Sequence, residues 1–221
     1  MTDDAYKEVF YNLPKENGIG RGKNKIELDI DSTCEIFELG DRSACIKCKK
    51  DNSSFADCNE KVLKVNPCNH RLVIVNHEDY ISQFNGKKFA EGGRCDLLLF
   101  DTEKHKIAFC ELGCYSEIYV ETKKAKAQKQ TKDSMSRFMQ TPSGKDFVEQ
   151  FAKKCLLFAR RERMIVPSSG CLQPERAKEE LNMQVFNTNP ASTSSLVVSD
   201  WKVDNVETQF VIVNYPSLYR W

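Results

Sequence analysis

Short apolar runs bounded by polar residues define the middle of this chain. Residues 71–76 contain four consecutive aliphatic side chains, and residues 94–100 and 106–112 repeat the pattern. Runs of this length and composition predict buried β-strands. Since only the polar residues 101–105 separate the second run from the third, we expect these two strands to form an antiparallel hairpin.

Further apolar runs predict additional strands, at residues 25–30, 155–160, 183–186 and 209–214. Residues 119–139 lack glycine and proline and are rich in Lys, Ala, Gln and Met, which predicts a long helix that ends before Pro142 and Gly144. Shorter helices are expected at residues 5–11, 145–153 and 174–182. Strands followed by a helix and another strand predict an α/β fold, with a mixed central sheet flanked by helices.

The polar and cysteine-bearing stretches before residue 71 show little of this periodicity. Residues 1–25 contain Pro14, Gly18, Gly20 and Gly22, which predicts a loosely held N-terminal arm. Residues 40–70 are expected to be rich in loops.

Composition narrows the classes of function. The chain of 221 residues is 40% hydrophobic and 29% charged, as in ordinary globular domains, and its net charge is only +1. A nucleic-acid site would therefore have to be a local basic patch. No stretch is apolar over 18 residues, and the N-terminus lacks the features of a secretory signal. We expect a cytoplasmic protein without membrane contact, whose ten cysteines are reduced thiols.

Two acidic residues interrupt otherwise apolar strands: Asp96 in GRCDLLL and Glu111 in AFCELG. If residues 102–105 form the hairpin loop, these carboxylates face each other across the ladder with Cβ atoms roughly 5 Å apart. Carboxylates this close repel unless a cation lies between them, and oxygen ligands favour Mg²⁺ or Mn²⁺. A second interpretation pairs both acids with Arg94 or Lys106 on a solvent face, and a register slip of one residue would separate them.

At these residues the chain resembles the PD-(D/E)XK nuclease superfamily, and more narrowly its small bacterial members with a restriction-endonuclease-like fold. The resemblance rests on Gly-Arg-Cys-Asp at 93–96, Glu-Leu at 111–112 and Ala-Lys-Ala-Gln at 125–128. It covers residues 70–186. We expect an N-terminal arm and Cys-rich region over 1–70 and a PD-(D/E)XK-like domain over 71–221.

The resemblance implies that Asp96 and Glu111 bind Mg²⁺, that Gln128 belongs to the catalytic site, and that a lysine follows the glutamate by two residues. Here that position is Gly113, which offers neither charge nor hydrogen-bond donor. Two interpretations stay open. Either Lys124, four residues before Gln128 and on the same helix face, replaces the missing lysine, or the site is inactive.

Other residues could complete such a site. The third acidic ligand could be Glu60, Glu78 or Asp79. Phosphate contacts are expected from the helix lysines, whose alternative role is a solvated face: Lys123, Lys126, Lys129 and Lys132.

Four cysteines have a spacing that is compatible with a structural Zn²⁺ site: Cys45, Cys48, Cys58 and Cys68. Free thiols are the alternative, because the usual glycine of a zinc knuckle is missing. The three histidines, at positions 70, 77 and 105, are scattered and are expected to be structural or exposed.

The sequence thus predicts a metal-dependent nuclease that hydrolyses nucleic-acid phosphodiesters, and the resemblance implies a role in bacterial defence. The alternative is a catalytically inactive nuclease-fold subunit that binds nucleic acid, a partner protein or a second copy of itself. Gly113 and the near-neutral net charge favour this alternative. A third interpretation is a zinc-stabilised adaptor whose first 70 residues bind a partner protein.

Overall fold

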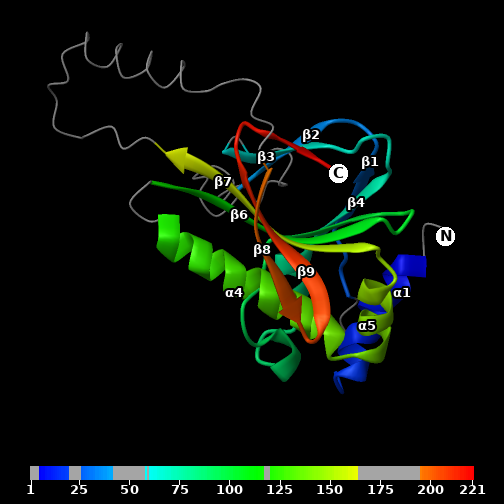
Figure 1. Ribbon diagram of the computed structural model, residues 1–221. Helices are drawn as coiled ribbons and strands as arrows, with labels where there is room; N and C mark the ends of the chain where they lie inside the picture. Colours follow the sequence, from blue (N-terminus) through cyan, green and yellow to red (C-terminus); the bar gives the residue numbers. More distant parts are fainter. Residues whose placement is uncertain (1–4, 20–25, 42–57, 59, 117–119, 164–194) are drawn as a thin grey trace, which may run out of the picture.

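A seven-stranded mixed sheet forms the centre of the computed structural model, which describes residues 5–19, 26–41, 58, 60–116, 120–163 and 195–221 (Figure 1). In spatial order its strands are β1 (Ile30–Thr33), β4 (Leu72–Asn76), β5 (Leu97–Asp101), β6 (Lys106–Ser116), β7 (Lys153–Arg163), β9 (Val206–Asn214) and β8 (Ser195–Val203). A three-stranded sheet has the order β10 (Leu218–Arg220), β3 (Lys61–Asn66) and β2 (Phe37–Gly40).

The large sheet changes from antiparallel to parallel pairing at its middle. From β1 to β6, each strand is antiparallel to its neighbour. β6, β7 and β9 are parallel to one another, and β8 returns antiparallel at the edge. The connection from β6 to β7 runs through two helices, as a crossover between parallel strands requires.

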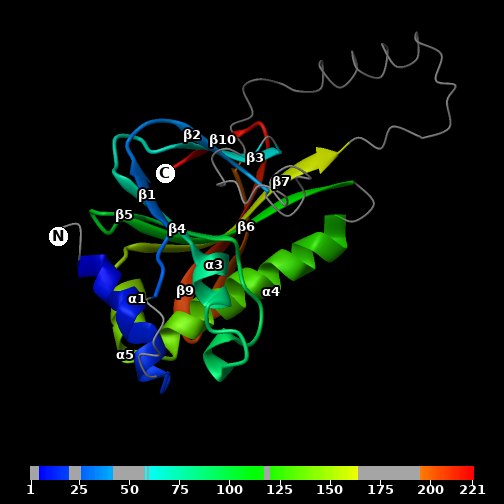
Figure 2. The same cartoon turned by 180° about the vertical axis from the view of Figure 1, so that it is seen from behind.

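Helices cover one face of the large sheet and the small sheet covers the other, as Figures 1 and 2 show. In the described ranges the helices are α1 (Ala5–Glu16), α3 (His77–Ser82), α4 (Val120–Met139) and α5 (Pro142–Glu149), with a 3₁₀ turn at Lys88–Ala90. Side chains alternate between the two faces, so Leu98 and Phe100 pack under the helices while Leu97 and Leu99 pack against the small sheet. No helix within the described ranges is long and apolar enough to cross a membrane.

The predicted mixed α/β fold is confirmed. β4, β5, β6, β7 and β9 lie where apolar runs predict strands, and α4 covers the predicted long helix almost residue for residue. β6 extends beyond its prediction to Ser116, and α5 begins at Pro142 rather than at 145. The candidate helix 174–182 and strand 183–186 lie outside the described residues.

The first 70 residues contribute more structure than the sequence predicts. α1 places Tyr6, Phe10 and Leu13 in the core under the large sheet, so the expectation of a loosely held arm is wrong for this helix. These residues are spaced by four and three, which is one helical stripe. β3 lies within the stretch expected to be loops and buries Val62 and Leu63 completely. The strand expected at 25–30 is instead β1, which begins at Ile30.

Candidate functional site

The β5–β6 hairpin brings Asp96 and Glu111 together. Leu97 pairs with Cys110, so the next step of the same ladder sets Asp96 opposite Glu111, which is the predicted register. Phe109 belongs to the core under the helices, and Glu111 follows it by two residues on the same strand. Both carboxyl groups therefore lie on the helix-covered face of the sheet.

The backbone of β6 provides hydrogen bonds to two carboxylates where β5 no longer pairs with it. The N–H of Leu112 donates to Asp96 Oδ2 at 2.6 Å, and the N–H of Cys114 donates to Asp41 Oδ2 at 2.9 Å. Strand N–H groups need an acceptor. Because Asp41 directly follows β2, the small sheet reaches the same edge of β6 as Asp96.

Two further acids act electrostatically on this pair. Asp41, which is only 4% exposed, and Glu78, in the first turn of α3, both raise the pKa values of Asp96 and Glu111. Of the three candidates for a third acid, Asp79 is instead held by Asn76, whose side chain caps α3. Glu60 Oε2 accepts a hydrogen bond from the Cys114 thiol at 3.7 Å.

The two central carboxyls hold their protons strongly. Burial is the main cause that raises the pKa of Glu111 to about 10, and the charge of Asp96 raises it further. Burial likewise raises the pKa of Asp96 well above its usual range, although the hydrogen bond from Leu112 opposes this shift. The Lys126 ammonium lowers both pKa values, so its positive charge acts on both acids.

This arrangement fits a divalent cation. Glu111 Oε2 is buried and has no hydrogen-bond partner among the described residues. Leaving a buried polar atom without a partner costs about 1–3 kcal/mol, and more if the atom is charged. A hard cation such as Mg²⁺ or Mn²⁺ prefers oxygen ligands like those of Asp96 and Glu111. The same residues would need to lose their protons to bind it.

The alternative pairing of these acids with Arg94 or Lys106 is not present. The Arg94 guanidinium donates to Ala90 O and to Asn85 Oδ1. The Lys106 ammonium lies 4.8 Å from the ring centre of Trp221. Neither cation is therefore bonded to Asp96 or Glu111.

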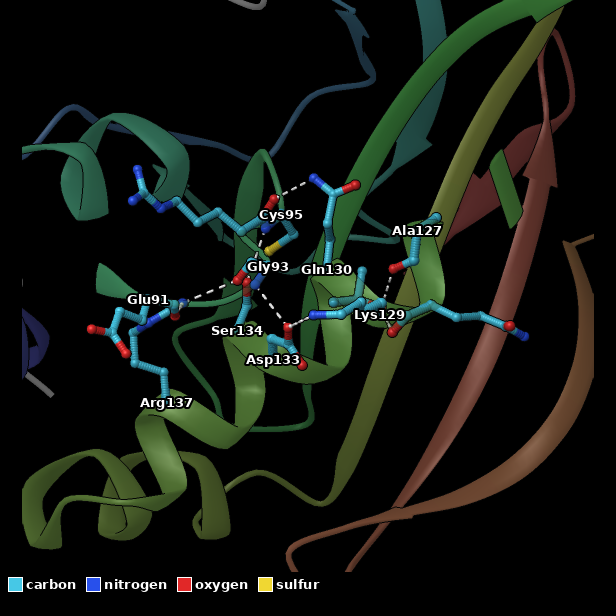
Figure 3. Close-up of polar contacts among 12 residues, drawn as sticks. Glu91, Gly93, Cys95, Ala127, Lys129, Gln130, Asp133, Ser134 and Arg137 are labelled. Carbon is cyan, nitrogen blue, oxygen red and sulfur yellow. Dashed lines mark hydrogen bonds and ion pairs between the residues drawn. The ribbon is translucent and has the colours of Figure 1, made fainter. Parts of the chain in front are cut away.

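Helix α4 holds the segment that leads into Asp96, and Figure 3 shows the contacts. Gln130 donates to Arg94 O, Ser134 accepts from the Cys95 N–H, and Asp133 accepts from the Gly93 N–H. The Arg137 guanidinium donates to three carbonyls of the same segment, those of Phe89, Glu91 and Gly93. The Gly-Arg-Cys-Asp motif is thus docked along one side of α4.

The other support for Asp96 is α3. The N–H groups of His77 and Glu78 both donate to Asp96 O, and His77 Nδ1 contacts Cys95 O at 3.1 Å. Because a carbonyl only accepts, Nδ1 carries the proton. Burial lowers the pKa of His77 to about 3, so this ring is neutral. His77 is structural, in line with the sequence-based expectation.

Lys126, and not Lys124, lies on the side of α4 that faces the acids. Gln130, one turn after Lys126, bonds to the segment before Asp96. Two residues rotate a helix by about 200°, so Lys124 points to nearly the opposite side. Lys124 instead forms an ion pair with Glu121 at 3.5 Å. Gln128 shares the flank of Lys124, and its backbone carbonyl accepts from the Thr131 hydroxyl.

The four lysines expected to contact phosphate do not form a single stripe. Each step of three residues rotates the helix by about 300°, so Lys123 and Lys132 lie on opposite sides. Lys129 is bound to Asp133 at 2.8 Å, and that carboxylate also holds the Gly93 N–H. Lys123 and Lys126 are both exposed near the start of α4. Of these two, Lys126 acts on both acids through its charge.

The proposed zinc cysteines are only partly described. Cys58 is buried beside Asp41, before β3, while Cys68 is exposed after it. The six residues of β3 separate them by roughly 20 Å. Ligands of one zinc ion lie within about 4 Å of one another, so these two thiols do not share a site. Cys45 and Cys48 lie outside the described residues.

Asp41 and Lys126 are the site residues that sequence reasoning did not assign to these roles. Asp41 belongs to a stretch without strand periodicity, and no spacing connects it to Asp96. The spacing of Lys126 and Gln130 by one helical turn places them on the same side of α4, but only the fold shows which segment Gln130 contacts.

Comparisons of the chain with protein-family models, with curated proteins and with solved structures found no match.

Proposed function

We propose that this protein is a divalent-metal-dependent nuclease of the PD-(D/E)XK type, built on a restriction-endonuclease-like core. The observation that carries the proposal is the adjacency of Asp96 and Glu111 on an antiparallel pair, with Glu111 Oε2 buried and lacking a partner in the described structure. The order of the elements supports it: the β5–β6 hairpin is followed by the basic helix α4 and then by the parallel strand β7.

In this proposal each residue near the site has a distinct task. Asp96 and Glu111 hold Mg²⁺ through their carboxylate oxygens. When bound, the ion would stabilise negative charge on the scissile phosphate and lower the pKa of a coordinated water. Lys126 takes the role of the lysine that the family has at the position of Gly113, since its ammonium acts on both acids. Lys123 adds a phosphate contact at the same end of α4.

The second candidate function is a nucleic-acid-binding subunit without catalysis. Gly113 favours it, because no ammonium stands beside Glu111 on β6 itself. Lys126 is exposed, so its position is set by fewer contacts than that of a strand lysine would be. The two functions differ in whether metal-dependent cleavage requires Glu111 and Lys126.

The test is cleavage of single- and double-stranded DNA and RNA by the full chain with Mg²⁺ or Mn²⁺. We expect Glu111→Gln to abolish cleavage and Lys126→Ala to lower its rate at least about 100-fold, as loss of one charge-stabilising group does. Lys124→Ala is the matched control, because it removes an ammonium two residues away on the other flank, and its rate should remain near that of wild type.

Each outcome selects one interpretation. Equal cleavage by wild type and Glu111→Gln would contradict the nuclease proposal. Loss of activity in Lys124→Ala but not in Lys126→Ala would return the catalytic role to Lys124. Metal-dependent binding of nucleic acid by a wild type that does not cleave it would favour the non-catalytic subunit.

A further inference from the structure

A second group of metal-ligating side chains lies at the other end of the β5–β6 hairpin. Ligand atoms of His70, Asp101, Glu103 and His105 all lie within 4.8 Å of one another. His70 comes from the turn between β3 and β4, Asp101 ends β5, and Glu103 and His105 lie in the turn between β5 and β6. Six residues of β6 separate His105 from Glu111, roughly 20 Å, so this group is distinct from the acidic site.

Two distances in this group are close to those between the ligands of one zinc ion. Glu103 Oε2 lies 3.0 Å from His70 Nδ1 and 3.3 Å from His105 Nδ1. Tetrahedral zinc, with ligands about 2.0–2.1 Å from the metal, separates them by roughly 3.3 Å. Two imidazole nitrogens and one carboxylate oxygen are a donor set that zinc commonly uses.

Asp101 belongs to the group but is not available as a ligand. Its Oδ1 accepts from the N–H groups of Glu103 and His105. Its Oδ2 accepts from the Lys106 N–H and from Trp221 Nε1. An ionised carboxylate has about four lone-pair sites, and these four donors use them all. Asp101 therefore organises the turn that presents Glu103 and His105.

The backbone that carries the ligands is held by two neighbouring segments. The Lys104 and His105 carbonyls accept from Ala152 N and Lys153 N, at 3.0 and 2.8 Å. The Thr102 N–H donates to Arg71 O, which ties this turn to the residue next to His70. The ligand side chains remain partly open to solvent: His70 is 28% exposed, Glu103 55% and His105 58%. A rigid frame with accessible ligands suits exchange of a metal ion with solvent.

We propose that His70, Glu103 and His105 bind one Zn²⁺, with water at the fourth position. Glu103 and the enclosed Asp101 supply two negative charges near the ion, which balance its charge. The bound ion would cross-link the β3–β4 and β5–β6 turns. Trp221, which donates to Asp101, brings the C-terminal residues next to the same turn.

The experiment titrates metal-stripped full-length protein with Zn²⁺ and, separately, with Co²⁺, whose visible absorption reports four-coordinate binding. We expect His70→Ala and His105→Ala each to weaken binding at least about 100-fold, the upper end of the losses caused by removing an outer-shell partner. The ligands are on exposed turns, so melting curves should show that the variants remain folded.

Cys68→Ser is the matched control, because this exposed thiol is two residues from His70 and belongs to the thiol site that the sequence suggests. The control should bind Co²⁺ like wild type, without a sulfur-to-cobalt band in the near ultraviolet. The proposal is overturned if the double variant His70→Ala/His105→Ala keeps wild-type affinity, or if binding is lost only in Cys68→Ser. Nuclease activity is not a readout here, so failure of this site would leave the acidic site untouched.

Discussion

At Glu111 a proton and the proposed metal ion would compete for the same buried carboxylate. The pKa of this group rises to about 10 in the folded chain, against an ordinary value of 4.5. At neutral pH the folded, metal-free protein therefore keeps the proton that the unfolded chain has lost. A cation that binds here must displace it, so metal binding and any cleavage that depends on it should strengthen as the pH rises.

The same competition predicts how stability depends on pH. Between about pH 4.5 and pH 10 the folded state binds more protons at Glu111 than the unfolded state does, so the free energy of unfolding falls as the pH rises. Glu111→Gln removes this proton uptake. In a chelator, we expect the variant to gain stability relative to wild type between pH 5 and pH 9, by at least about 1.4 kcal/mol, the equivalent of one pKa unit.

Urea denaturation at several pH values measures this difference. Glu149→Gln, an exposed acid in an ion pair with Lys145, is the control and should follow the wild-type profile. Parallel profiles for Glu111→Gln and wild type would mean that the carboxyl is ionised in the folded chain.

At the scale of elements, α4 positions the acidic site because the loop before Asp96 packs in close contact with the helix backbone. A Cβ at Gly93 would lie 2.8 Å from the Cα of Gln130 and 3.0 Å from Asp133 Oδ2. The first contact is with helix backbone, which cannot rotate away. Glycine at this position of the motif is therefore required by packing between loop and helix.

Gly93→Ala should push this loop away from α4. We expect a loss of about 1–3 kcal/mol in the free energy of unfolding, typical of overpacking, together with weaker Mn²⁺ binding because Asp96 moves with the loop. Gly86→Ala is the contrasting control: its φ is +81° and nothing lies within 4 Å of its Cβ position. It should cost only backbone strain, about 1–2 kcal/mol, with metal binding unchanged. Unchanged Mn²⁺ affinity in Gly93→Ala would show that the position of this loop does not affect metal binding by Asp96.

At the scale of the whole molecule, α1 completes the core although it lies far in sequence from the strands it covers. Phe10 is fully buried and makes edge-to-face contacts with Tyr80, Phe138 and Phe147. These partners come from α3, α4 and α5, so one side chain of the N-terminal helix connects the three other helices of the described residues. Residues 5–16 are thus an integral part of the domain, whatever the boundary suggested by the motifs.

Phe10→Ala tests this role. It should lower the free energy of unfolding by about 3–5 kcal/mol, the usual cost of removing a buried aromatic ring. Ile36→Ala is the control, since Ile36 is 55% exposed, and it should change stability by less than about 0.5 kcal/mol. A two-state urea transition measures both. A small effect of Phe10→Ala would show that α1 can detach without loss of the core.

The sequence by itself determined the strands around the site and the long helix, and it predicted the register that sets Asp96 opposite Glu111. Local alternation and the length of one polar turn are sufficient for a hairpin, because its register depends only on neighbours along the chain. Helical spacing also places Tyr6, Phe10 and Leu13 on one side of α1, but only the fold shows that this side packs under the large sheet.

The tertiary structure alone decided which distant side chains meet. Asp41 reaches Asp96 through a second sheet, Lys126 faces the acids because α4 docks on the segment 89–95, and His70 meets His105 because two turns lie side by side. None of these contacts can be read from a periodic pattern in the sequence, because each depends on how separate elements pack and not on the residue spacing within one element. Packing is decided by the burial of the whole core, and that is a property of the folded chain.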